Sequence, residues 1–168
     1  MDYLSHRAAK DRFFATDHHS PLPCHLRVSF ARLAYYEPDP ALAFHLDLRP
    51  ADGSTVDIGT SDGQVRRYVR AATVQFSVEG EERTLTLLAA DGRPGFFLPF
   101  RDATSGRETY GAGRYLDIDG IGDGTVEVDF NLAYNPYCAY DDAYSCPLPP
   151  HENWLDVPIR AGERTFSD

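Results

Sequence analysis

Apolar and polar residues alternate along most of the chain from about Val28 onward, a period of two that is typical of β-strands with one buried face. The alternation is clearest at 42–48, 74–78 and 126–130. The N-terminal stretch from Asp2 to Phe14 instead places its apolar residues on one broad face of a helix, which Asp2 is suited to cap. The pattern predicts an all-β protein with one N-terminal helix.

Turn residues divide the alternating region into about eight or nine strands. Two hairpins are predicted, one joining 42–48 to 56–58 through Pro50–Ser54 and one joining 74–78 to 85–87 through Glu79–Glu82. Further strands are predicted at 28–30, 65–69, 96–98, 110–118, 126–130 and 155–159. Short, regularly spaced strands favour an antiparallel sandwich or barrel. Residues 1–168 are expected to form one domain, with residues 1–22 as a helix and linker packed on the β-domain.

The segment from Asp129 to Asn153 is a long connection without a periodic pattern, and it is rich in asparagine, tyrosine, cysteine and proline. Loops of this length are usually functional or disordered. The high aromatic content argues against disorder. This loop is therefore the predicted location of a site.

Several short motifs resemble one known family. They are Lys10–Phe14, Ser20–Leu22, Phe97–Gly106, Glu108–Tyr110, Gly113–Leu116, Asp129–Asn131, Asn135–Cys138, Cys146–Pro150 and Glu152–Asn153. Together they are similar to the family called domain of unknown function 1684. The resemblance covers nearly the whole chain and implies no particular activity.

Arg114 has the same strand parity as Leu116 and Ile118, so its side chain is expected on the apolar face. A buried guanidinium must be paired, because an isolated charge inside a protein costs many kcal/mol. The candidate partners are Asp102, Glu108 and Asp129. One interpretation is a structural ion pair that ties the loop to the sheet. The other is an arginine held ready for a carboxylate or phosphate of a ligand.

The preferred functional hypothesis is a pocket beside the Asp129–Asn153 loop that binds a small polar or anionic molecule. The predicted ligand-binding residues are Asp102, Tyr110, Arg114, Asp129, Asn131, Asn135, Tyr137 and Cys138. A first alternative is a hydrolase- or lyase-type enzyme that uses a carboxylate or Cys138 in the same pocket. In that scheme Cys138 or Cys146 is the nucleophile, His151 the base, and Glu152 or Asp129 orients the base. A second alternative is an interaction or structural module whose polar residues only lock the loop.

The three cysteines leave several interpretations open. They are small buried thiols, a Cys138–Cys146 disulfide that leaves Cys24 free, or a metal site completed by His151. The histidines at 18, 19 and 25 are expected in a solvated linker. We expect no bound metal and no cofactor.

The formal net charge of -10 disfavours nucleic acid and anionic membranes as partners. No apolar run approaches the roughly 18 residues that a membrane-spanning helix needs. The N-terminus lacks the basic and apolar regions of a secretory signal, so a cytoplasmic location is expected. A small-molecule ligand is the expected partner, and the sequence does not define an oligomeric state.

Overall fold

The computed structural model describes residues 1–120 and 122–167. Its helices are α1 (Tyr3–Thr16) and α2 (Cys24–Arg27), and its strands are β1 (Ala43–Asp47), β2 (Arg49–Pro50), β3 (Thr55–Gly59), β4 (Val65–Val78), β5 (Glu81–Ala89), β6 (Phe96–Phe100), β7 (Arg114–Ile118) and β8 (Thr125–Asp129). Short 3₁₀ helices are η1 (Pro40–Leu42), η2 (Phe130–Leu132), η3 (Tyr137–Ala139) and η4 (His151–Asn153). No helix among the described residues is long and apolar enough to cross a membrane.

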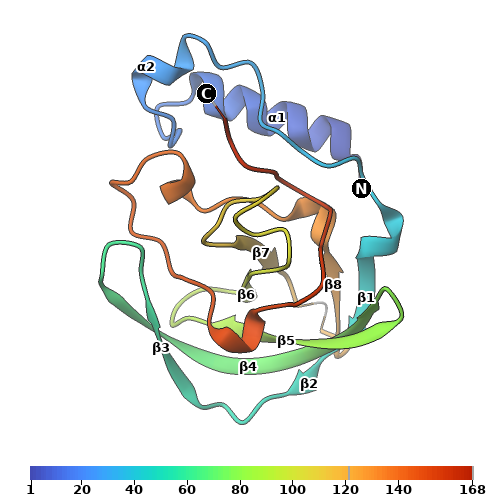
Figure 1. The fold of residues 1–168 in the computed structure, drawn as a ribbon. Helices are drawn as coiled ribbons and strands as arrows, with labels where there is room; N and C mark the ends of the chain where they lie inside the picture. The colour runs from blue at the N-terminus through green and yellow to red at the C-terminus, as the bar shows by residue number, and fades with distance from the viewer. Residues whose placement is uncertain (121, 168) are drawn as a thin grey trace.

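The strands form two antiparallel sheets. The larger sheet has the order β2-β4-β5-β6-β7, with β3 also paired to β4, and the smaller sheet consists of β1 and β8. Figure 1 shows β4 as a long curved strand along which β3 and β2 both lie. The predicted all-β antiparallel fold is confirmed, and the eight strands of the described residues agree with the predicted number.

The main hydrophobic core fills the space between the two sheets and the C-terminal segment. Alternate residues of β4 are buried, as the period of two requires for one inward face. The Phe130 ring, just beyond β8, packs against Phe44, Phe76 and Phe100 with centroid distances of 6.1, 5.5 and 5.3 Å. The end of β8 is therefore anchored in the core where the long loop begins.

Helix α1 is fixed at both its N-terminus and its inner face. The Asp2 carboxylate accepts a hydrogen bond from the Ser5 amide at 3.1 Å, which confirms the predicted cap. Phe14 packs in a second core with Leu22, Leu33 and Tyr140. In Figure 1 the C-terminal segment runs up to this helix, where the Lys10 ammonium forms an ion pair with Glu163.

The second predicted hairpin is confirmed by the pairing of β4 with β5, but the first is wrong. Strand β1 pairs with β8, and β3 pairs with β4. Alternation predicts that a segment is a strand and which face is buried, but it carries no information about the partner strand. The chain passes from the smaller sheet to the larger one at Leu48, between β1 and β2, and the segment after Pro50 then joins β2 to β3, which both pair with β4.

Two further predicted strands are wrong. Residues 28–30 follow α2 as irregular chain, and the Val28 side chain is 92% exposed. Residues 155–159 do alternate in burial, but no ladder forms there. Leu155 donates to the Arg101 carbonyl at 2.8 Å and the Val157 carbonyl accepts the Ala103 amide at 3.1 Å. The Ile159 amide, however, donates to the Asp102 carboxylate at 2.6 Å, so backbone pairing stops there.

Candidate functional site

Arg114 and Asp102 lie together in the interior, with both side chains 0% exposed. The register of β6 and β7 places Arg114 opposite Phe100, close to the turn that carries Asp102. The two charges are 3.5 Å apart, and the guanidinium also donates to the carbonyls of Ile159, Ala161 and Glu163. Burial lowers the pKa of Arg114, and the nearby Asp102 opposes that shift. The prediction that Arg114 is buried against a carboxylate is confirmed for Asp102.

The other two candidate partners of Arg114 are used elsewhere. Glu108 pairs with Arg160 at 3.2 Å, and Asp129 accepts a hydrogen bond from the Tyr3 hydroxyl at 2.6 Å. The donors of Arg114 are directed to backbone carbonyls of the C-terminal segment. The geometry of Arg114 therefore fits the structural interpretation.

The two predicted asparagines fasten the loop to distant segments. The Asn131 side chain bonds both backbone groups of Asp39 at 2.8 Å. The backbone N–H of Asn135 donates to the Glu163 carboxylate at 2.7 Å, and the Asn135 side chain donates to the Arg164 carbonyl at 2.9 Å. Both side chains are buried and bonded within the chain, so their role in ligand binding stays a prediction.

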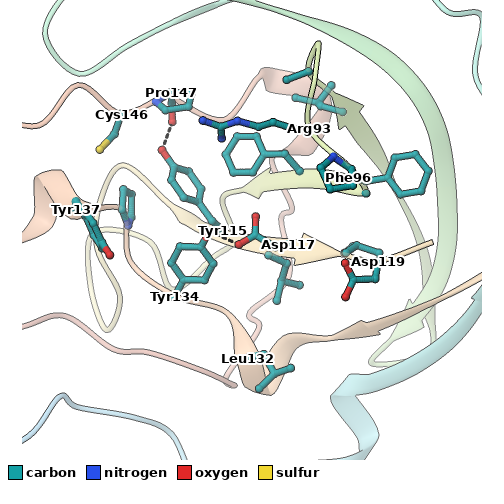
Figure 2. Close-up of a pocket in the computed structure, with 18 of the residues that line it drawn as sticks. Arg93, Phe96, Tyr115, Asp117, Asp119, Leu132, Tyr134, Tyr137, Cys146 and Pro147 are labelled. Atoms are coloured by element: carbon teal, nitrogen blue, oxygen red, sulfur yellow. Dashed lines mark hydrogen bonds between the residues drawn. The ribbon is translucent and has the colours of Figure 1, made fainter. Parts of the chain in front are cut away.

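A cavity of about 870 Å³ lies beside the loop, between α1, the β6–β7 hairpin and residues 132–147. Of the eight predicted ligand-binding residues, Tyr137 is the one that lines this cavity in the described structure. Figure 2 shows Tyr137, Tyr134, Tyr115 and Phe96 around this space, with Cys146 and Pro147 at its edge. The loop therefore borders a pocket, as predicted, but a different set of side chains forms its walls.

One wall of the cavity is a continuous row of aromatic rings. The Phe97 ring packs against Tyr68 at 5.7 Å and against Tyr115 at 4.7 Å, and Tyr115 packs against Tyr134 at 5.8 Å. The Lys10 ammonium lies 4.9 Å from the centre of the Tyr134 ring. Such a wall offers planar apolar surfaces on which a ring of a ligand can stack.

Hydroxyl groups of this wall are held by fixed acceptors. Tyr134 donates to the Asp117 carboxylate at 2.7 Å, and Tyr115 donates to the Pro147 carbonyl (Figure 2). Burial is the largest cause that raises the pKa of each hydroxyl, and the Asp117 carboxylate adds to the effect at Tyr134. Both tyrosines therefore stay neutral at physiological pH and act as rigid walls.

The charged groups at the cavity are mixed in sign. Lys10, Arg66 and Arg93 contribute positive charge, and Asp117 and Asp119 contribute negative charge. Lys10 is paired with Glu163, and Arg66 donates to the Ser145 carbonyl at 2.6 Å. Within the described chain neither Arg66 nor Arg93 forms an ion pair. Two guanidinium groups at the cavity thus have no carboxylate partner in the described chain.

Sequence reasoning missed most of these wall residues, although one signal was present. Tyr115, Asp117 and Asp119 alternate with the buried Arg114, Leu116 and Ile118, so the opposite face of β7 combines an aromatic ring with two carboxylates. The pairing of Phe97 with Asp117 and the position of α1 over this face come from tertiary structure.

Cys138 and Cys146 are free thiols that lie side by side, whereas Cys24 is exposed in α2. The proposed nucleophile–base arrangement does not assemble in the described structure. His151 stacks on Trp154 with a centroid distance of 3.9 Å, and Glu152 pairs with Arg70 at 3.0 Å. Tyr110 instead contacts the Cys138 sulfur, with 3.6 Å between the hydroxyl oxygen and Sγ.

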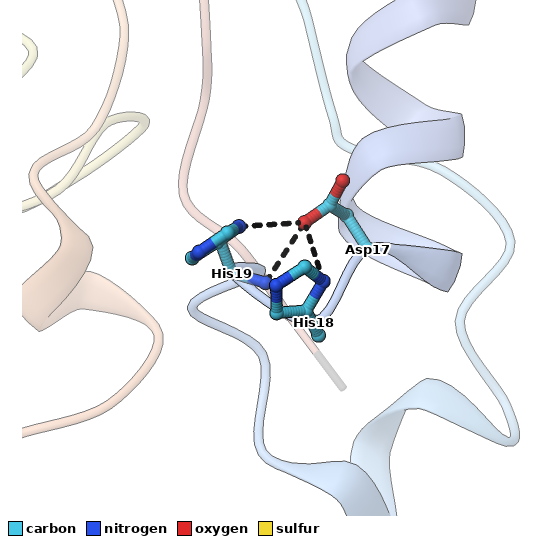
Figure 3. A group of neighbouring side chains, drawn as sticks. All are labelled: Asp17, His18 and His19. Carbon is cyan, nitrogen blue, oxygen red and sulfur yellow. Dashed lines mark hydrogen bonds and ion pairs between the residues drawn. The ribbon is translucent and has the colours of Figure 1, made fainter.

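Asp17, His18 and His19 form a cluster at the end of α1, with their potential ligand atoms all within 4.8 Å of one another (Figure 3). The Asp17 carboxylate accepts the His19 amide at 2.8 Å and lies 3.3 Å from the His19 ring nitrogen. The hydrogen bond from the His19 amide is the largest cause that lowers the pKa of Asp17. Both histidines are exposed, so the cluster has the geometry of a solvated turn.

These features define a class of protein: a small antiparallel β-protein whose N-terminal helix and long β8 loop enclose an aromatic cavity. The family model described as "Protein of unknown function (DUF1684)" matches residues 28–164, and the chain belongs to that family. The solution NMR structure of an uncharacterised protein from Haloarcula marismortui is similar, with 42% identity and a TM-score of 0.73. That similarity covers 96% of this chain and 91% of the archaeal one. No curated protein matches.

Proposed function

We propose that this protein binds a small molecule that combines a flat, apolar ring with an anionic group, in the cavity between α1, the β6–β7 hairpin and the loop after β8. One observation carries the proposal: an aromatic-lined cavity of about 870 Å³ that presents two arginines without ion-pair partners in the described chain. Pockets of this size, mostly apolar with a few directed polar groups, are typical of small-molecule sites.

The chemistry of the walls supports this class of ligand. The rings of Phe97, Tyr115 and Tyr134 favour a planar body. Arg66 and Arg93 favour a carboxylate or phosphate, because a guanidinium donates two parallel hydrogen bonds to such a group. The net charge of -10 would repel an anion at a distance, so local arginines are needed to hold one.

The test uses 8-anilinonaphthalene-1-sulfonate, a fluorescent probe that carries both a flat ring system and an anionic group. We expect saturable binding to the folded protein, one probe per chain. Arg93→Gln should weaken binding roughly two- to fivefold, the size of one solvent-exposed ion pair. Arg93 is exposed, so this change should leave the fold intact.

The matched control is Arg12→Gln, which makes the same charge change on the exposed side of α1, away from the cavity. Its affinity for the probe should equal that of the wild type. Tyr137→Leu should also weaken binding, because it keeps apolar volume but removes a ring from the wall. Equal affinities of Arg93→Gln and Arg12→Gln, or no saturable binding, would contradict the proposal.

A further inference from the structure

Cys138 and Cys146 come from different parts of the long loop, and the backbone holds them together. Cys138 lies in η3, and its amide points at the Cys146 sulfur with 3.3 Å between N and Sγ. Cys146 is fixed in turn by the turn before β4, because its amide donates to the Ser61 hydroxyl at 3.0 Å and its carbonyl accepts the Ser61 amide at 2.8 Å. The two cysteines are therefore neighbours in the folded chain, with the Cys146 sulfur against the backbone of Cys138.

The two thiols have different environments. Cys138 is half-buried and contacts the Tyr110 hydroxyl, whereas Cys146 is 7% exposed and borders the cavity. A hydrogen bond from the Cys146 thiol lowers the pKa of Cys138 to about 6, and Tyr110 lowers it further against the effect of burial. The same interaction and burial raise the pKa of Cys146. Cys138 is therefore the more accessible thiol and the one whose pKa is lowered, although the Cys138 amide that points at the Cys146 sulfur acts against the rise at Cys146.

Tyr110 is suited to donate to the Cys138 thiolate. Burial and the adjacent Cys138 raise the pKa of the Tyr110 hydroxyl, so it remains protonated. The other titratable groups that act on the pair are Tyr115, whose pKa the two cysteines help to raise, and Arg66, whose charge favours ionisation of Cys146. A low-pKa thiolate next to a protonated second thiol is the arrangement that exchanges disulfides rapidly.

We propose that Cys138 and Cys146 form a redox-active dithiol in which Cys138 attacks a low-molecular-weight disulfide and Cys146 resolves the intermediate. Cys146 borders the proposed ligand cavity, but the reaction of the two thiols does not require a ligand there. The Cys138 thiolate attacks one sulfur of the disulfide RSSR, and the S–S bond breaks to release one thiol and leave a mixed disulfide on Cys138. The Cys146 sulfur then attacks Cys138 and expels the second thiol.

Atoms and electrons balance in this sequence. The two protein thiols lose two electrons and two protons, and RSSR gains them to become two RSH molecules. The proton that Cys138 releases on ionisation and the proton of Cys146 end on the two departing thiols. The product is an intramolecular disulfide between Cys138 and Cys146.

The experiment uses the full chain with Cys24→Ser, which removes the exposed third thiol. The folded protein is treated with glutathione disulfide, and intact mass and peptide mapping are followed with time. We expect loss of two hydrogens and a linked 138–146 peptide, with only transient glutathione adduct. Adding Cys146→Ser should trap a stable glutathione adduct on Cys138.

The proposal is wrong if the Cys24→Ser protein accumulates stable adducts on both thiols, or if neither thiol reacts while the protein is folded. Adding Cys138→Ser instead should slow the reaction at least tenfold, because Cys146 is buried and protonated. Equal reactivity of the Cys138→Ser and Cys146→Ser proteins would also overturn the assignment of roles.

A pH profile of Cys138 alkylation tests the role of Tyr110 as a positioning residue. In the Cys24→Ser protein the rate should level off near neutral pH, whereas an ordinary thiol continues to gain reactivity up to about pH 8.5. Tyr110→Phe keeps the ring but removes the hydroxyl donor, so the midpoint should move to higher pH. Tyr36→Phe removes a hydroxyl that is not among the groups found to act on either thiol, so it is the control and should leave the midpoint unchanged. Equal midpoints in the Tyr110→Phe and control proteins would remove Tyr110 from the site.

Discussion

Arg114 shows how a single buried charge connects the sheet to the end of the chain. Its guanidinium joins β7 to Asp102 and to the backbone of the C-terminal segment. Removing it takes away the counterion of the buried Asp102 carboxylate, which keeps only neutral donors such as the Ile159 amide, and leaves carbonyls of the C-terminal segment without a donor. Arg114→Ala should therefore reduce the free energy of unfolding by about 3–5 kcal/mol, measured by urea denaturation.

Two comparisons sharpen that prediction. Arg114→Lys should rescue only part of the loss, because an ammonium cannot reach the same spread of acceptors. Arg67→Ala removes an arginine from an exposed ion pair with Asp57 and should leave the unfolding midpoint unchanged. An Arg114→Ala protein as stable as Arg67→Ala would show that the buried contacts contribute nothing.

Asn153 has a comparable role through hydrogen bonds without charge. Its side chain is completely buried, accepts the Thr86 amide at 2.8 Å, and donates to the carbonyls of Thr86 and Pro99 at 2.9 and 3.0 Å. It thereby joins β5, β6 and η4 where strand pairing is incomplete. Asn153→Ala should cost about 2–4 kcal/mol, because buried groups lose their partners.

The control for Asn153 is Asn153→Asp, which keeps the volume and an acceptor oxygen but has no donors. It should be at least as destabilising as Asn153→Ala, since it places a carboxylate against two carbonyls. Thermal unfolding of both variants decides the question. A stable Asn153→Asp protein would mean that the donors of Asn153 are unimportant.

The alternation along the strands correctly predicts which side chains are buried at some of these positions but not at others. It placed Arg114 on the buried face because β7 is regular as far as Ile118. Continued past β8, the same alternation would put Asn131 on the face opposite the buried Phe130, yet Asn131 is 3% exposed. The reason is that β8 ends at Asp129 and η2 turns the next side chains, so parity no longer applies.

At the scale of elements, the contacts that hold α1 over the cavity include one ion pair with a buried carboxylate. Lys10 and Phe13 line the cavity, and the Lys10 ammonium meets the Glu163 carboxylate, whose side chain is 2% exposed. Lys10→Met should leave that carboxylate without its counterion and loosen the helix. We expect a loss of about 2–4 kcal/mol in stability and faster amide hydrogen exchange in α1 than in β4 and β5.

The double variant Lys10→Met/Glu163→Gln tests the cause of that loss. It removes both charges, and the neutral amide still accepts hydrogen bonds from the Asn135 amide and the Tyr140 hydroxyl. Stability and α1 protection should recover in part, because a buried charge no longer lacks a partner. A double variant that is less stable than Lys10→Met would show that Glu163 contributes to stability for reasons other than its charge.

The sequence predicted where the strands lie better than it predicted which strands pair with each other. Local alternation was sufficient for β4, β5 and β8 because each has one inward face. The pairing of β1 with β8 joins segments about eighty residues apart, and no local pattern specifies it. The same limit applies to the cavity, since α1 and β7 meet only in the folded chain.

At the scale of the whole molecule, the loop after β8 connects nearly every part of the fold. It reaches β7 through Tyr115 and Tyr134, the turn before β4 through Ser61 and Cys146, and β5 through Thr86 and Asn153. Aromatic residues supply many of these contacts. The expected single domain stays a prediction, for which one cooperative unfolding transition seen by both Trp154 fluorescence and circular dichroism is the check.

Buried tyrosines give the whole molecule a predicted sensitivity to alkali. Tyr115 and Tyr140 are each 6% exposed, and burial is the largest cause that raises the pKa of both hydroxyls. In the unfolded chain a tyrosine loses its proton near pH 10. Above that pH the unfolded state binds fewer protons than the folded state, so stability must fall as pH rises. The expected loss is about 1.4 kcal/mol per pH unit for each such tyrosine.

Urea denaturation between about pH 8 and pH 11, together with tyrosinate absorbance, measures this effect. The decline in stability should be steepest above about pH 9.5, where tyrosines of the unfolded chain begin to ionise, and part of the absorbance change should coincide with unfolding. Tyr115→Phe removes one of the titrating groups. The free energy of unfolding of this variant should therefore fall less steeply with pH than that of the wild type, by about the effect of one proton. Tyrosinate absorbance that is complete near pH 10 in a protein that remains folded would contradict the assignment of raised pKa values to Tyr115 and Tyr140.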